Sequence, residues 1–260
     1  MSPLTLDPAD APAEVGTAAP AFSGLLRFIH YGFMPNHYGY CGGDDNREIL
    51  ERGAAAEVDR GVEPLLRKFA GALPYLKLIA RANAIADPFD DRVVEAYWLG
   101  NDLLRGVEVR QLYDHLVERF GRQLPASTMK WIAGKAPAGA RPHHNFHVFD
   151  LYTRAGDPDH SLDTMDNCRV SWGAVVADLG SQLLVERQPL VLLEGKLRLG
   201  PAEPFLAARQ IDGRGFVGQV AAGAQVALHW GWVCEELTDR QLTSLRQYTA
   251  QHLALANQTL

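Results

Sequence analysis

The apolar residues of this 260-residue chain change from a helical spacing to a strand spacing near residue 160. Between residues 56 and 134 they recur three and four positions apart, as Leu65, Leu66 and Phe69 do, which is typical of amphipathic helices. After Asn167 the sequence alternates, is rich in Val and Leu, and has glycine-containing turns about ten residues apart, which is typical of short strands. Together the two patterns predict a fold of the α+β class, with helices first and strands later.

Three parts of the chain are expected. Residues 1–20 are rich in Ala, Pro and Asp and lack the basic start and apolar core of a signal peptide, so they predict a disordered tail. Residues 21–160 predict a mainly helical domain. Residues 161–260 predict a small β-barrel with a C-terminal helix, because evenly spaced short strands precede one helical segment that begins after Thr238.

Composition excludes several classes of function. The net charge is −6 and no long basic stripe is present, so we expect no nucleic-acid partner. No apolar run approaches the roughly 20 residues of a membrane span, so we expect no membrane partner. Three cysteines are an odd number without the spacing of a disulfide framework. They favour free thiols in a reducing compartment, and the expected location is the cytoplasm.

A thiol and an imidazole in the C-terminal half are candidate metal ligands. Cys168 is placed at the start of the first predicted strand, and His229 in the last predicted strand, GAQVALHWGWV. In a small closed barrel the first strand often lies beside a late strand, so the two side chains could meet at one rim. The alternative from the residues alone is a buried cysteine that packs as a small hydrophobe and a hydrogen-bonded core histidine.

The residues around this pair resemble the HypC-type chaperones of [NiFe]-hydrogenase assembly. That family has a cysteine shortly before a glycine, a glycine- and histidine-containing strand, and a final helix. The matching positions here are Cys168, Gly173, Gly223, Val226, His229, Gly231 and Leu237. Trp172 and Ala224 stand where the family has proline and an acidic residue, and Cys168 is internal, whereas the family's cysteine follows the initiator methionine. The resemblance covers residues 168–256 and implies an OB-like, HypC-like β-barrel.

The resemblance also implies a function. HypC-type chaperones, with a HypD-type scaffold protein, hold an iron atom that carries cyanide and carbon monoxide, and deliver it to the hydrogenase large-subunit precursor. The expected role is therefore a maturation factor with iron as transient cargo, more a chaperone than an enzyme. A thiolate and an imidazole suit such iron, since one is a soft and the other a borderline donor. The expected partner-binding residues are Cys168, Trp172, Gly173, His229 and Gly231.

The N-terminal half supplies a second set of candidate ligands. Cys41 lies in the segment over residues 34–46, whose many turn-forming residues predict an ordered loop. His143, His144 and His147 lie close together in HHNFH. These residues could complete a first-row metal site, which gives a second hypothesis, a metal-dependent enzyme. Hydrogen-bonded, buried imidazoles are the simpler interpretation of the same residues. A third hypothesis is a non-catalytic interaction module that has lost cargo binding.

The whole chain further resembles a group of uncharacterised bacterial proteins, often associated with hydrogenase gene clusters and known only as a domain of unknown function. The segments that carry this likeness are PNHYGYCGG, ADPFDDRVVEAYW and HHNFHVF. This second resemblance supplies no chemistry of its own.

Overall fold

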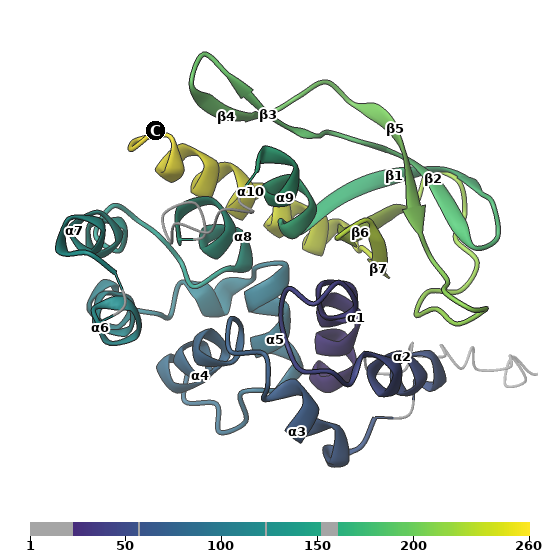
Figure 1. The fold of residues 1–260 in the computed structure, drawn as a ribbon, viewed down its shortest axis with the longest axis horizontal. Coiled ribbons are helices and arrows are strands. Elements are labelled where there is room, and N and C mark those ends of the chain that lie inside the picture. The colour runs from purple at the N-terminus through teal and green to yellow at the C-terminus, as the bar shows by residue number, and fades with distance from the viewer. Residues whose placement is uncertain (1–22, 57, 123, 152–160) are drawn as a thin grey trace, which may run out of the picture.

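The protein is described by a computed structural model that covers residues 23–56, 58–122, 124–151 and 161–260 (Figure 1). Its helices are α1 Gly24–His37, α2 Asn46–Ala55, η1 Arg60–Val62, α3 Glu63–Leu66, α4 Leu73–Ala82, α5 Asp91–Trp98, η2 Asp102–Leu104, α6 Val109–Phe120, α7 Ala126–Lys135, α8 His144–Phe146, η3 His147–Leu151, α9 Leu162–Cys168 and α10 Asp239–Ala256. Within these ranges no helix is both long and apolar enough to cross a membrane. The tail predicted over residues 1–20 lies outside them.

Five antiparallel pairings and one parallel contact organise the described strands. The strands are β1 Ser171–Asp178, β2 Gln182–Arg187, β3 Leu190–Leu193, β4 Lys196–Leu199, β5 Glu203–Ala208, β6 Gln225–His229 and β7 Trp232–Glu236. Five of them follow one another in the order β1-β2-β5-β7-β6, and β6 pairs back to β1. The β5–β7 step of this ring is the single parallel pair of Ala208 with Trp232. β3 and β4 form a separate hairpin.

The predicted α+β class is confirmed, while the likeness to an OB or HypC barrel stays a prediction. The N-cap at Thr238 is also confirmed, because its side chain accepts from the main-chain N–H of Gln241 at the start of α10. Three local expectations were wrong. Cys168 is the last residue of α9 rather than the first of a strand. The segment GAQVALHWGWV is a hairpin of two strands. α1 continues through Pro35 into the segment predicted as a loop.

One hydrophobic core joins the helical half to the sheet. Its buried residues include Phe28, Tyr97 and Trp98 from the helices and Trp232 and Leu245 from the later part of the chain. α1 lies against β6 and β7. Aromatic edges make part of this contact: the ring centroids of Phe33 and Trp232 are 5.2 Å apart. Side chains from both halves can therefore meet at one site.

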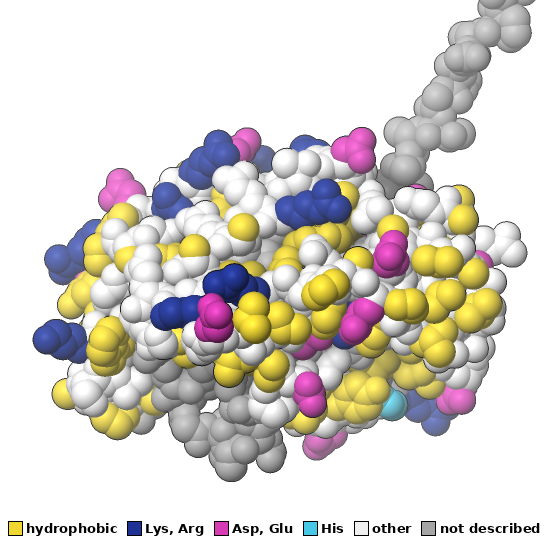
Figure 2. Space-filling model, turned by 90° about the horizontal axis from the view of Figure 1, so that it is seen from above, with side chains coloured by type: hydrophobic (Ala, Val, Ile, Leu, Met, Phe, Trp, Pro, Cys, Tyr) yellow, Lys and Arg dark blue, Asp and Glu magenta, His cyan; other side chains and the backbone are white. Residues whose placement is uncertain are grey.

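The sheet also presents apolar side chains to solvent. Val176, Leu179 and Leu206 are each more than half exposed. Figure 2 shows hydrophobic side chains gathered over the right-hand part of the face it displays, the side on which the sheet lies in Figure 1. A cluster of exposed apolar residues is typical of a surface that contacts another molecule. None of these three residues lines the cavity described next.

Candidate metal centre

A cavity of about 350 Å³ lies where the helical half meets the β6–β7 turn. Its wall is formed by the end of α1, the segment between α3 and α4, and parts of α5, α8, α9 and the turn. The lining residues are Pro35, Tyr40, Cys41, Gly42, Lys68, Phe69, Ala70, Gly71, Ala72, Tyr97, Trp98, His144, His147, Cys168, His229 and Trp230. Aromatic rings, two thiols and three imidazoles thus surround one space.

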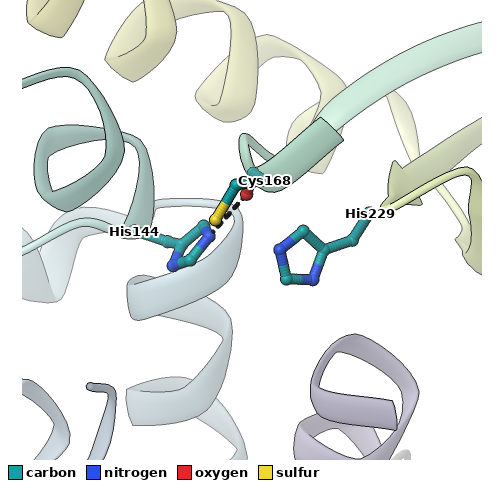
Figure 3. Close-up of side chains that lie close together, drawn as sticks. All are labelled: His144, Cys168 and His229. Atoms are coloured by element: carbon teal, nitrogen blue, oxygen red, sulfur yellow. Dashed lines mark hydrogen bonds between the residues drawn. The ribbon is translucent and has the colours of Figure 1, made fainter. Parts of the chain in front are cut away.

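Three of these residues form a compact set of metal-type ligands. His144 begins α8, Cys168 ends α9 and His229 ends β6. One ligand atom from each lies within 4.8 Å of the other two, and Figure 3 shows the side chains converging. Metal–ligand bonds of 2.0–2.3 Å place donors roughly 3.5 Å apart in a tetrahedral site. A side-chain movement of about 1 Å would therefore suffice to close the three residues on an ion.

His229 is oriented as a metal ligand. Its Nδ1 donates to the main-chain carbonyl of Tyr31 at 2.6 Å, and since a carbonyl can only accept, the proton resides on Nδ1. Nε2 is buried and has no hydrogen-bond partner among the described residues. Burial lowers the pKa of His229 to about 4, so the ring is neutral at pH 7 with a lone pair on Nε2. Metal-ligating histidines typically donate their other N–H to a carbonyl in this way.

The Tyr31 carbonyl is available because of Pro35. In a helix this carbonyl would accept from the N–H four residues later, and that residue is Pro35, which has none. The proline ring also displaces the carbonyl of residue i−4 from the helix axis. α1 thus contains a proline two residues before its last residue, His37, and the freed carbonyl of Tyr31 accepts from His229.

His144 has a partner at each nitrogen. Nε2 donates to the Cys168 carbonyl at 2.7 Å, and Nδ1 lies 3.2 Å from the Tyr97 hydroxyl, which donates to it in this tautomer. Burial holds the pKa of His144 well below its usual value, so the ring is neutral. Coordination through either nitrogen breaks one of these two bonds. The Tyr97 hydroxyl can donate or accept, so it satisfies Nδ1 in either tautomer.

The two thiols at the cavity are held in the protonated form. Burial raises the pKa of Cys168 to about 12; a charge on nearby Cys41 raises it further, and the Trp230 side chain lowers it. Burial also raises the pKa of Cys41 to about 12. Cys41 lines the cavity but lies outside the set whose ligand atoms are within 4.8 Å of one another. An incoming metal must therefore displace a proton from Cys168.

The β6–β7 turn brings an aromatic residue to the cavity. Trp230 and Gly231 both have positive φ, 55° and 69°, as a two-residue type I′ hairpin requires. This conformation is unfavourable for a bulky residue and is usually compensated by its surroundings. The Trp230 ring stacks on Tyr40, with centroids 4.1 Å apart. That contact ties the turn to the segment after α1 and closes one side of the cavity.

Five of the six predicted metal ligands line this one cavity: Cys41, His144, His147, Cys168 and His229. The two candidate sites expected in separate halves therefore lie together. His143 does not join them. Its ring stacks on Tyr248 at 5.6 Å, and its Nδ1 accepts from the main chain at the start of α8.

The predicted partner-binding residues are more dispersed. Trp172 packs near the Arg246 guanidinium, 5.6 Å from its ring centroid. Gly173 lies in β1 where a Cβ would come within 3.1 Å of Val185, so it permits close approach of β2. Cys168 and His229 line the cavity, and Gly231 supports it from the turn. Sequence reasoning missed Tyr97 and Trp230, which contact the ligand residues.

A family model described as "Family of unknown function (DUF6390)" matches residues 20–260. The chain belongs to this family. The DUF6390 match spans both the helical half and the sheet, so the cavity between them lies inside the matched region. No curated protein and no solved structure matches the chain.

Proposed function

We propose that this protein binds one transition-metal ion, with iron as the preferred metal, through His144, Cys168 and His229. We further propose that it serves as an assembly factor for a [NiFe]-hydrogenase. The observation that supports metal binding is the approach of one thiol and two imidazoles to within 4.8 Å inside one cavity. Neutral imidazoles are ready to coordinate without losing a proton. The thiol, once deprotonated, adds a soft donor.

The proposed site suits a metal that enters and leaves. Three protein ligands leave coordination positions open, whereas permanent structural sites usually close all four. The cavity is much larger than an ion, so a metal with its own small ligands fits inside. Cys41 on the same wall would offer a second thiolate during transfer. These properties favour a carrier over a structural metal site.

The hydrogenase role rests on the resemblance of residues 168–256 to HypC-type chaperones. In that role the cargo is an iron-cyanide-carbonyl unit, and the partners are the large-subunit precursor and a HypD-type scaffold. Tyr38 and Tyr40 are 57% and 45% exposed near the cavity and would meet such a partner first. Cys168 would pass the iron between the two proteins.

Anaerobic isolation from a maturation-competent host tests both parts of this proposal. We expect about one iron per chain in the wild type and little in Cys168→Ala or His229→Gln. We expect the large-subunit precursor or the scaffold to co-purify with the wild type. Iron content that both variants retain would contradict the site. Wild-type iron without either partner would contradict the hydrogenase role and leave the site intact.

A second candidate is a metal-dependent enzyme. Three protein ligands with an open position are also the arrangement of catalytic zinc sites. The Tyr97 hydroxyl beside His144 would then be available for proton transfer. Stoichiometric zinc in place of iron, in protein grown with both metals, would favour this reading over the assembly role.

A further inference from the structure

A second cavity, of about 320 Å³, lies between α4 and α6. Lys77 and Arg81 reach it from α4, and His115, Glu118 and Arg119 from α6. Three cations thus share the space with one carboxylate, in a chain whose net charge is −6. This local excess of positive charge opposes the overall charge of the protein, and it favours an anion as counter-charge.

The protein does not supply that counter-charge from its own described residues. None of the carboxylates in the described ranges forms a salt bridge with Lys77, Arg81 or Arg119. At the start of the same α6, by contrast, Arg110 pairs with Asp114 at 2.9 Å. The cations at the cavity are therefore available to a ligand.

Arg119 is held in place before any ligand arrives. Its two terminal nitrogens donate to the main-chain carbonyls of Ala70 at 2.8 Å and Gly71 at 3.1 Å. Its guanidinium also lies over the Tyr75 ring, 5.0 Å from the centroid. A cation fixed in this way loses little conformational entropy on binding an anion.

His115 adds a polar group to the wall. Its Nε2 is buried without a hydrogen-bond partner among the described residues. Burial, together with the charges of Arg119 and Arg81, lowers its pKa to about 4, so the ring is neutral at pH 7. A neutral imidazole can present an N–H donor, and a small ring rotation would bring that donor to an anion in the cavity.

We propose that this second cavity binds a small phosphate-type oxyanion, either inorganic phosphate or the phosphate group of a small monoester. Its oxygens would accept charge-assisted hydrogen bonds from Lys77, Arg81 and Arg119. The side chain of Leu78 and the ring of Pro74 provide an apolar edge against which the rest of a monoester would lie. This site is separate from the metal centre and does not depend on it.

Titration of the full-length protein with inorganic phosphate at low ionic strength tests the proposal, with calorimetry and the His115 imidazole NMR signals as readouts. We expect saturable binding at one site per chain that shifts the His115 signals. Arg81→Gln should weaken binding at least about tenfold, since it removes a charge-assisted bond. Lys77→Gln should weaken it in the same direction.

Arg214→Gln is the matched control, because Arg214 is exposed and lies outside the cavity. We expect its phosphate affinity to stay within about twofold of the wild type. No saturable binding, or an equal loss in Arg81→Gln and Arg214→Gln, would overturn the proposal. Glycerol phosphate, as a second probe, distinguishes inorganic phosphate from a phosphate monoester as the ligand. If glycerol phosphate binds, a monoester fits the cavity; if only inorganic phosphate binds, the site belongs to the free anion.

Discussion

Nδ1 of His229 donates a 2.6 Å hydrogen bond to the main-chain carbonyl of Tyr31, and Pro35 leaves that carbonyl without its helical donor. The bond fixes the tautomer of His229 and directs Nε2 away from Tyr31. A helix irregularity in the N-terminal half thus prepares a ligand in the C-terminal half.

Pro35→Ala should weaken metal binding. Alanine supplies an N–H that competes with His229 for the Tyr31 carbonyl, so His229 loses its fixed orientation. We expect metal affinity, measured by competition with a chelator, to fall about tenfold, as loss of an outer-shell partner does elsewhere. The free energy of unfolding should not decrease, because alanine restores a helical hydrogen bond.

Pro74→Ala is the matched control for this substitution. Pro74 occupies the first turn of α4, where no helical donor is missing, and it does not line the metal cavity. Its metal affinity should equal that of the wild type. Unchanged affinity in Pro35→Ala, with the new helical bond seen by NMR, would refute the role assigned to Pro35.

The three thiols should differ in their effects on metal binding. Cys168→Ala should abolish it, since the thiolate is a direct ligand. Cys41→Ala should reduce affinity less, because Cys41 lies outside the compact set. Cys234→Ala should keep the metal, since Cys234 is fully buried in the core, and should cost about 1 kcal/mol of stability. Metal analysis measures the bound metal, and urea unfolding measures the stability. Equal loss of metal in the three variants would contradict the assignment of Cys168 as the thiolate ligand.

Metal affinity should rise with pH. Burial raises the pKa of Cys168 to about 12, so the thiol is protonated at neutral pH and releases one proton on binding. His229 has a pKa of about 4 and releases none above pH 6. Affinity should therefore increase about tenfold per pH unit between pH 6 and 8. A flat profile would mean that the thiol does not coordinate, and Cys168→Ala should show that flat profile in any residual binding.

Acid should destabilise the fold through its buried histidines. Burial lowers the pKa of His30, His143 and His147 to about 3, from 6.5 in the unfolded chain. These rings are neutral when folded, so the stability they confer is complete above pH 6.5 and is lost as pH falls toward 3. Each of these rings should lower the free energy of unfolding by about 1.4 kcal/mol for each pH unit of acidification in that window.

Urea unfolding at pH 7, 6 and 5 measures this loss. His143→Phe removes one titrating ring while keeping an aromatic side chain against Tyr248, so its stability should fall less steeply with acid. His37→Gln, a substitution at an exposed position, is the control. Stability that is equal at pH 7 and pH 5 would contradict the buried, neutral state of these rings.

Local sequence rules predicted the class of fold and failed where chain geometry depends on distant contacts. The helical and alternating segments were recognisable from spacing alone. By local rules Pro35 predicts the end of a helix, yet α1 continues past it. The Tyr31 carbonyl, which Pro35 leaves without a helical donor, accepts from His229 instead. The Trp-Gly pair between β6 and β7 could have indicated a two-residue turn, but tryptophan is a poor residue for positive φ, so the signal was weak.

The candidate site was only partly predictable for a similar reason. Cys168 and His229 could be paired through the predicted barrel, and Cys41 could be grouped with the histidines of HHNFH. That both groups face one cavity depends on how α1, α5 and α8 pack on the sheet, which no local pattern encodes. His143 is the extended N-cap residue of α8 and His144 is its first helical residue, so their side chains point in different directions and only His144 joins the site.

X-ray absorption at the metal edge of the anaerobically reconstituted protein identifies the atoms that bind the metal. We expect bound iron whose first shell contains one sulfur, from Cys168, and two imidazole nitrogens, from His144 and His229. In Cys168→Ala the sulfur should disappear from the shell together with most of the iron. A first shell of oxygen and nitrogen alone in the wild-type protein, or a sulfur signal that survives in Cys168→Ala, would contradict the proposed set of ligands.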